Sequence, residues 1–255
     1  MNRIDKSQNV AAKVAGISGL LAVVIVVFGN YVLLGPLVVP GKAAETAQNF
    51  LAHPTQVRAA LTCFLAYGLT VVVLLAALYV ILTPVDRLLA SIGALFRLVF
   101  ALLWLLTTLN LLGALRLLGN APYLQSFEAD RLQVLARLQI AASFDDYYIG
   151  LPFFALAATV CAYLWFKSSY IPRSLSAFGV IASAWCVICA FVFLIFPAFE
   201  NIVNAYWFDS PMAVFELLVS LWLLFGGLKV RDLSGADCVD DGSGKPLSLR
   251  LPVFL

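Results

Sequence analysis

Long uninterrupted runs of apolar residues dominate the pattern along the chain, and a membrane-spanning helix needs about 20 such residues. Six runs are long enough, and they cover residues 14–38, 56–82, 88–116, 148–166, 174–196 and 212–228. Most of the polar stretches between them are short. The pattern therefore predicts an all-α membrane protein built as a bundle of six transmembrane helices.

Two polar connections carry helical patterns of their own and predict two short outer interfacial helices. After the first run, "GKAAETAQNFLAHP" consists of good helix formers and is stopped by Pro54. After the third run, "SFEADRLQVLARLQIAAS" begins at Ser126, a suitable N-cap, and brings Phe127, Leu135 and Leu138 near one face. This second helix is expected to lie on the bundle or the membrane surface, as a structural lid or as a gate for a ligand.

Composition agrees with a membrane protein and argues against a nucleic-acid partner. The chain is 63% hydrophobic and 12% charged, whereas soluble domains carry about 25% charged residues. Lys and Arg (16) nearly balance Asp and Glu (14), and no basic stripe interleaved with aromatic residues appears. The first apolar run exceeds a signal-peptide core of about 7–15 residues, so it is expected to remain as a span. The lipid bilayer is therefore the expected partner.

The distribution of basic residues predicts the orientation and the extent of the membrane domain. Short, basic connections fall on the side of the N-terminus, and longer, acidic ones fall on the other side. Because Lys and Arg concentrate in cytoplasmic loops, both termini are expected in the cytoplasm. Residues 1–232 are predicted to form the transmembrane domain, and 233–255, rich in Gly, Ser and Asp, a mostly disordered cytoplasmic tail.

Arg97 is the one charge within "ASIGALFRLVFALLWLL", and its position makes it the first candidate for a functional residue. It lies roughly 13 Å beyond Leu88 along a helix axis, near the middle of a bilayer core about 30 Å thick. An unpaired arginine there costs at least about 2.5–3.5 kcal/mol, so Arg97 is expected to face the bundle and to have a partner. The residues on its helix face are Gly93, Ala101, Trp104 and Thr108.

Glu216, in "MAVFELLVSLWLL", is the expected partner because it is the only carboxylate well inside an apolar run. Three interpretations remain open. Arg97 and Glu216 form a buried structural ion pair, or they line a polar cavity that holds a lipid or a small amphipathic anion, or Arg97 reaches the inner interface alone. In the second interpretation the ligand-binding residues are Arg97, Glu216, Trp104, Thr108 and Asn110.

Other polar groups favour structural roles. Asn110, with its neighbouring threonines, is expected to make interhelical hydrogen bonds near the outer face. Asp145 and Asp146 precede the fourth run, where carboxylates cap a helix more often than they bind a cation. The "CVIC" spacing of Cys186 and Cys189 lies inside an apolar helix and indicates buried small residues rather than a redox or metal site.

Motifs for catalysis and for cofactors are missing from the sequence. The chain has one histidine, His53, in an outer connection, and no HExxH, Walker or GxSxG motif. We therefore expect no catalytic residues, no metal site and no cofactor. An enzyme using the outer carboxylates is the least favoured hypothesis, after a binding or transport protein and a non-catalytic membrane scaffold.

Several stretches, taken in order, resemble one protein family. They are "AGISGLLAVVIVVFG", "LVVPGKAAETAQNFLAHPTQVRAAL", "LYVILTPVDRLLASIGALFRLV", "YLQSFEADRLQVLARL" and "YLWFKSSYIPRSLSAFGVI". Their order and spacing resemble the bacterial multi-pass membrane family named domain of unknown function 4386, over about residues 12–230. The resemblance implies a six-helix protein of the bacterial inner membrane. It implies no activity, so it assigns no catalytic residues.

Overall fold

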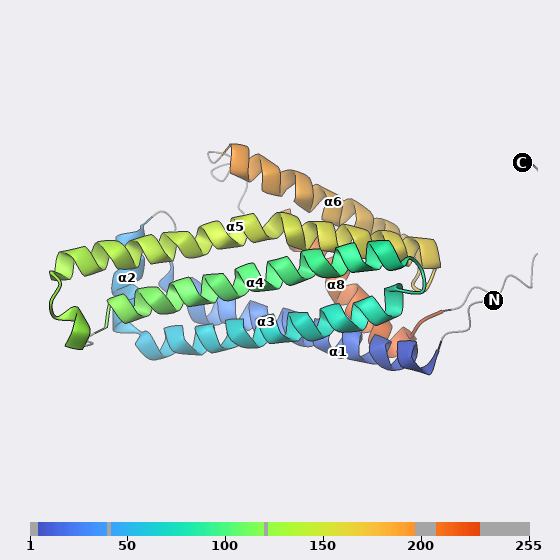
Figure 1. Ribbon diagram of the computed structural model, residues 1–255, viewed down its shortest axis with the longest axis horizontal. Helices are drawn as coiled ribbons and strands as arrows, with labels where there is room; N and C mark the ends of the chain where they lie inside the picture. Colours follow the sequence, from blue (N-terminus) through green and yellow to red (C-terminus); the bar gives the residue numbers. More distant parts are fainter. Residues whose placement is uncertain (1–4, 40–41, 120–121, 197–207, 230–255) are drawn as a thin grey trace, which may run out of the picture.

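The computed structural model describes residues 5–39, 42–119, 122–196 and 208–229. Within these ranges the chain forms helices and turns and no strand, which confirms the predicted all-α class. Most of the long helices run along the long axis of the molecule (Figure 1). The α-helices are α1 (Lys6–Val27), α2 (Ala43–Ala52), α3 (Pro54–Leu82), α4 (Arg87–Leu117), α5 (Ala129–Ser168), α6 (Arg173–Ile195) and α8 (Ser210–Leu221).

The first span is longer than the apolar run that predicted it. It begins at a capping box, in which the Asp5 carboxylate accepts from the backbone of Lys6 and the Gln8 side chain accepts from the Asp5 N–H. After α1 the helix continues as a π-helix, Phe28–Leu34, and a 3₁₀ turn, Gly35–Leu37. The whole segment from Lys6 to Leu37 contains 32 residues. A good cap therefore starts the helix before its apolar part.

The first predicted outer helix is present as α2. It places Phe50 in the core, and it ends at His53, directly before Pro54. Proline is well suited to the first position of α3, because the N–H that it lacks has no partner within a helix at that position. The connection between the first two spans is therefore a short helix joined to α3 at a sharp corner.

The second predicted outer helix is not a separate element, and this prediction was wrong. The segment expected after Ser126 and the span expected at 148–166 form one helix of 40 residues, α5, which starts after Glu128 rather than Ser126. The sequence between them, "AASFDDYYIG", contains no residue that stops a helix before Gly150. Pro152 lies inside α5, where packing of α5 against α4 and α6 supports it.

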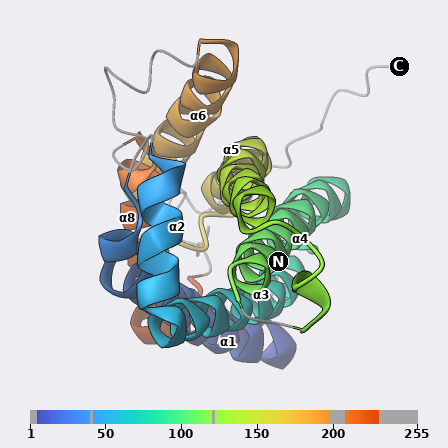
Figure 2. The ribbon, with the colours of Figure 1, turned by 90° about the vertical axis from the view of Figure 1, so that its left-hand side faces the viewer.

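The last two helices close one side of the bundle. One end of α6 leans away from α5 (Figures 1 and 2), and α6 packs on both α5 and α8. A Cβ atom on Gly179 of α6 would overlap the ring of Phe215, so only glycine permits this approach to α8. After α8 a π-helix, Trp222–Gly226, completes an apolar segment, Ser210–Gly226, which has the same length as the predicted 212–228 span and begins and ends two residues earlier.

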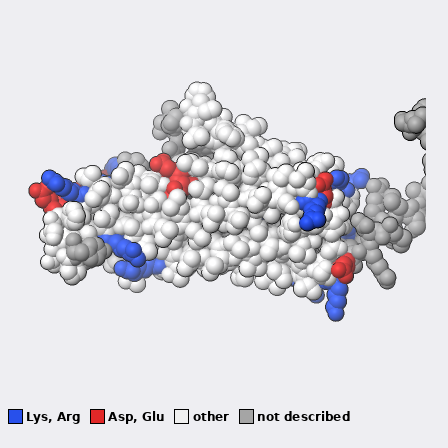
Figure 3. All heavy atoms as spheres, in the orientation of Figure 1, with Lys and Arg blue, Asp and Glu red and all other residues white. Residues whose placement is uncertain are grey.

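The surface of the bundle fits a lipid environment. Five described helical segments are long and apolar enough to cross a membrane, and Ser210–Gly226 is a shorter sixth. On the face shown in Figure 3, most charged side chains gather toward the two ends of the molecule; one acidic patch lies between them, and the rest of the surface there is uncharged. The start of α1 and the end of the Trp222–Gly226 helix lie at the same end of the bundle (Figure 1). The predicted tail, 233–255, lies outside the described residues.

Candidate functional site

Arg97 lies on the buried face of α4, in the interior of the bundle. It is 3% exposed, and Gly93, Ala101 and Trp104 are buried on the same face, as the helical spacing predicts. Small residues at Gly93 and Ala101 let α5 and its neighbours approach α4 closely beside the arginine. The charged side chain of Arg97 therefore lies in the apolar core, where it contacts neighbouring helices instead of lipid.

The partner expected from the sequence is present. Arg97 Nη2 donates to Glu216 Oε1 at 2.5 Å, which joins α4 to α8. The two side chains differ in accessibility, since that of Arg97 is 4% exposed and that of Glu216 is 21% exposed. The ion pair rules out Arg97 reaching the inner interface alone, and it leaves the carboxylate as the more accessible member.

The guanidinium of Arg97 is only partly satisfied. Its Nε–H lies on the same edge as Nη2, and Nε is buried with no hydrogen-bond partner among the described residues. Glu216 therefore contacts one of the two nitrogens, Nη2 and Nε, that a bidentate carboxylate would use on this edge. The ring of Phe154, on α5, lies 5.3 Å from Arg97 Cζ and contributes a cation–π contact.

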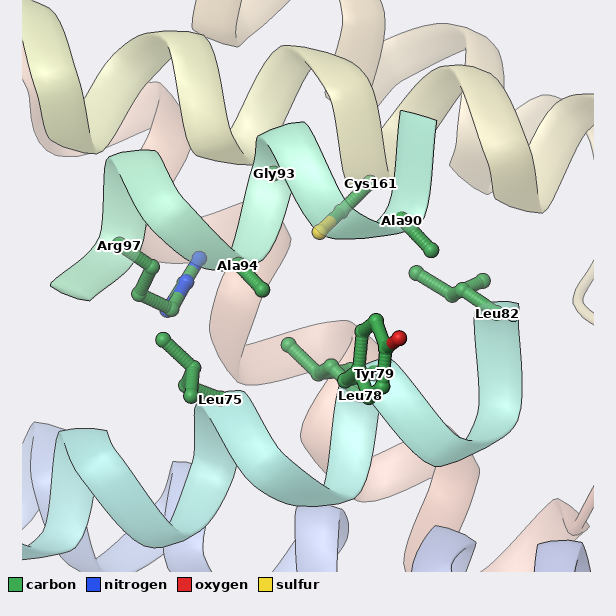
Figure 4. A pocket seen from close by; sticks show the side chains of 9 residues that line it. All are labelled: Leu75, Leu78, Tyr79, Leu82, Ala90, Gly93, Ala94, Arg97 and Cys161. Carbon is green, nitrogen blue, oxygen red and sulfur yellow. The ribbon is translucent and has the colours of Figure 1, made fainter. Parts of the chain in front are cut away.

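Two hollows adjoin Arg97. The first, about 230 Å³, lies between α3 and α4, and Figure 4 shows Arg97 directed from α4 toward Leu75 of α3. The second, about 380 Å³, is lined by Arg97 and Glu216 together with apolar residues such as Phe215 and Trp165. Both volumes include the open mouths of the hollows. The enclosed part of each hollow is small, so a ligand of more than a few atoms would need the helices to move.

Aromatic residues surround Trp104, two helical turns from Arg97 toward the far end of α4. The ring of Trp104 lies 4.8 Å from that of Tyr67 and 5.4 Å from that of Phe64, measured between centroids, and Phe100 lies beside them. The indole Nε1 of Trp104 is buried without a hydrogen-bond partner in the part of the chain that the structure describes. These rings close the interior beyond the ion pair.

The remaining predicted ligand-binding residues lie away from the ion pair. Thr108 is only partly buried and donates to the Trp104 carbonyl of its own helix, whereas its neighbour Thr107 takes the buried position. Asn110 donates to Asp146 Oδ2 of α5 at 2.6 Å. Trp104, Thr108 and Asn110 do not line either of the two hollows. Asn110 therefore makes the interhelical hydrogen bond that its position predicts.

The predicted capping role of the paired aspartates was wrong, because Asp145 and Asp146 lie in the middle of α5 and not at its start. A third carboxylate, Asp209 at the start of α8, accepts a hydrogen bond from the Tyr147 hydroxyl at 3.1 Å. Burial raises the pKa of Asp209 to about 6, and the tyrosine hydrogen bond only partly opposes this shift. Asp209 therefore changes its charge near pH 6.

Two residues next to the ion pair were not predicted from the sequence. Phe154 contacts the guanidinium, and Cys161 lines both hollows. They are seven residues apart on α5, so helical periodicity places them on one face. The sequence contains no signal that this face, among several apolar faces, meets Arg97. Across the described ranges no group of three or more His, Cys, Asp or Glu side chains is placed to hold a metal ion.

The apolar helices, the largely uncharged surface between the ends and the interior ion pair define an integral membrane protein of the multi-pass α-helical class. A family model described as "Domain of unknown function (DUF4386)" matches residues 14–227, most of the chain. The chain belongs to this family, as the resemblance predicted. No curated protein and no solved structure matches it.

Proposed function

We propose that this DUF4386 membrane protein binds a small amphipathic anion, such as a lipid-like carboxylate or phosphate, at Arg97. The observation that carries the proposal is the guanidinium edge of which Glu216 uses only one N–H, beside a hollow with apolar walls. Planar guanidinium groups bind carboxylate and phosphate oxygens in pairs. A ligand with two oxygens would contact Nε as well as Nη2, and its alkyl part would lie against Phe215 and its apolar neighbours.

A second function is favoured by the short contact between the charges. The hydrogen-bonded ion pair between Arg97 and Glu216 joins α4 to α8, as a structural clamp would. In that case the protein is a non-catalytic scaffold or partner subunit, and its function depends on other proteins. The two candidates differ in one measurable respect, because only the first requires a ligand that depends on Arg97.

The proposed location is the bacterial inner membrane with both termini in the cytoplasm. At the end of the bundle that holds the described chain ends, basic residues outnumber acidic ones, which is typical of cytoplasmic ends. They are Lys6, Lys13, Arg87, Lys167, Arg173 and Lys229, against Asp5 and Asp86. A fluorescent protein fused to the C-terminus should fold and fluoresce, and an alkaline phosphatase fused there should be inactive.

The experiment that tests the binding site is native mass spectrometry of the protein extracted from its own membranes. The wild type is compared with Arg97→Gln and with Arg116→Gln, a matched control at an exposed arginine of the same helix. We expect a discrete additional mass on the wild type and on Arg116→Gln that is missing from Arg97→Gln. Bare protein in all three samples favours the clamp.

A series of straight-chain carboxylates, from acetate to octanoate, then measures how the apolar walls contribute. Each buried CH₂ group contributes about 0.8 kcal/mol, so the affinity should increase roughly fourfold per carbon until the hollow is full. Arg97→Gln, in the same detergent or nanodisc, corrects for partitioning of the chain into lipid. The proposed site is contradicted if the affinity does not change with the length of the carboxylate. It is also contradicted if Arg97→Gln binds the carboxylates as tightly as the wild type does.

A further inference from the structure

Arg97, the one cation among the described residues that line the second hollow, is paired there with Glu216. Glu216 is the more exposed member of the pair, and it already contacts the N–H edge that an incoming anion would need. We infer that an anion reaches Arg97 by displacing the Glu216 carboxylate, which takes up one proton as it leaves. The inference rests on the proposed anion site and adds that binding there is coupled to protons.

The coupling follows from charge balance in an apolar interior. Arg97 carries one positive charge and Glu216 one negative charge, so the resting site is neutral. A monovalent anion added to this pair would leave a net negative charge among apolar residues, and uncompensated charges in such places are strongly unfavourable. One proton on the Glu216 oxygen restores neutrality. The anion then pairs with Arg97, and the protonated carboxyl group moves aside without carrying a charge.

The other titratable groups near Glu216 do not supply this proton balance. Glu216 interacts electrostatically with Tyr67 of α3, Cys161 of α5 and Cys186 of α6. Phenols and thiols ordinarily titrate above about pH 8, so these three stay neutral between pH 5 and 8. On α1, the residue that lines the same hollow is an alanine, Ala15.

Asp209 is the one nearby group that needs a control. It lies two turns before Glu216 on α8, and its pKa is about 6 because it is buried. Its hydrogen bond goes to Tyr147, and it does not line either of the two hollows next to Arg97. Protons taken up by Asp209 would change with pH but would not depend on Arg97. The Asp209→Asn variant removes this contribution and leaves the ion pair unaltered.

The test is isothermal titration calorimetry of the full chain in nanodiscs with octanoate as the probe. Titrations in two buffers of different ionisation enthalpy, between pH 6 and 8, count the protons taken up per octanoate bound. We expect one proton per anion in the wild type and in Asp209→Asn, with affinity falling about tenfold per pH unit. Glu216→Gln should bind without proton uptake, independently of pH, and more tightly than the wild type at pH 8.

The outcomes separate this inference from the proposed function. Octanoate binding that requires Arg97 but takes up no proton overturns the coupling and leaves the binding site standing. Proton uptake that persists in Glu216→Gln also overturns it, because the proton then goes elsewhere. Absence of Arg97-dependent binding in both the wild type and Glu216→Gln overturns the proposed function itself. Should Glu216→Gln fail to fold, the proton count of the wild type alone decides the coupling.

Discussion

Replacing Glu216 and Arg97 with leucine, singly and together, measures what the buried pair contributes to stability. Glu216→Leu leaves an arginine that is 3% exposed without a counter-charge, and breaking a buried pair in this way costs about 3–5 kcal/mol of unfolding free energy. Arg97→Leu leaves a carboxylate with a 21% exposed side chain, so its cost should be lower, about 2–3 kcal/mol. The unfolding free energy of the double variant should be within about 1 kcal/mol of that of the wild type, because neither charge is left buried without its partner.

The assay is reversible unfolding in mixed micelles, followed by circular dichroism for the wild type, both single variants and the double variant. Together they form a double-mutant cycle, and the expected coupling between the two sites is about 4 kcal/mol or more. Arg116→Leu, at an exposed arginine of the same helix, serves as the control and should change stability by less than about 0.5 kcal/mol. If the double variant loses the sum of the two single losses, the charges are not coupled and the reasoning is refuted.

Three further results are expected from the same unfolding assay. Gly179→Ala should lower the unfolding free energy by about 1–3 kcal/mol, because the added Cβ atom overlaps the Phe215 ring. Gly113→Ala, whose Cβ atom would lie 3.5 Å from its nearest neighbouring atom, should leave the unfolding free energy unchanged or raise it. Equal losses in the two variants would contradict the packing of Gly179 against Phe215. Because the pKa of Asp209 is raised to about 6, the unfolding free energy should be highest below about pH 4 and fall by up to about 3 kcal/mol as the pH rises through 6. Asp209→Asn should flatten this pH dependence. If the pH profile of the variant is unchanged, a group other than Asp209 causes the dependence. Trp104→Phe removes a buried indole N–H that has no partner among the described residues, so the unfolding free energy should change by less than about 1 kcal/mol. A loss above about 2 kcal/mol would show that the indole N–H has a hydrogen-bond partner.

The class of fold and the central contact follow from the sequence because both depend on strong, local physical constraints. Apolar runs of membrane-spanning length leave the backbone few alternatives to helix. A charge in such a run is costly unless it is paired, and Arg97 and Glu216 were the two candidates.

The parts that sequence reasoning missed depend on non-local packing. The polar residues of "AASFDDYYIG" look like the boundary between two helices, but they contain no helix breaker, and packing against α4 holds α5 together as one helix. Thr108 and Asn110 share a helix with Arg97, yet each lies more than two turns away along it. Which face of α5 brings Phe154 to the guanidinium depends on how three helices pack together.

The continuity of α5 sets how far the protein reaches from the membrane. At 1.5 Å per residue, 40 residues make a rod about 60 Å long, twice the thickness of the hydrocarbon core. Even at a tilt of 40°, the upper end of the usual range, the core holds only about 26 of these residues. About 14 residues, or 20 Å of helix, must therefore lie outside the hydrocarbon core. The part of α5 outside the core and the part that contacts Arg97 through Phe154 therefore belong to one helix, with Pro152 inside it.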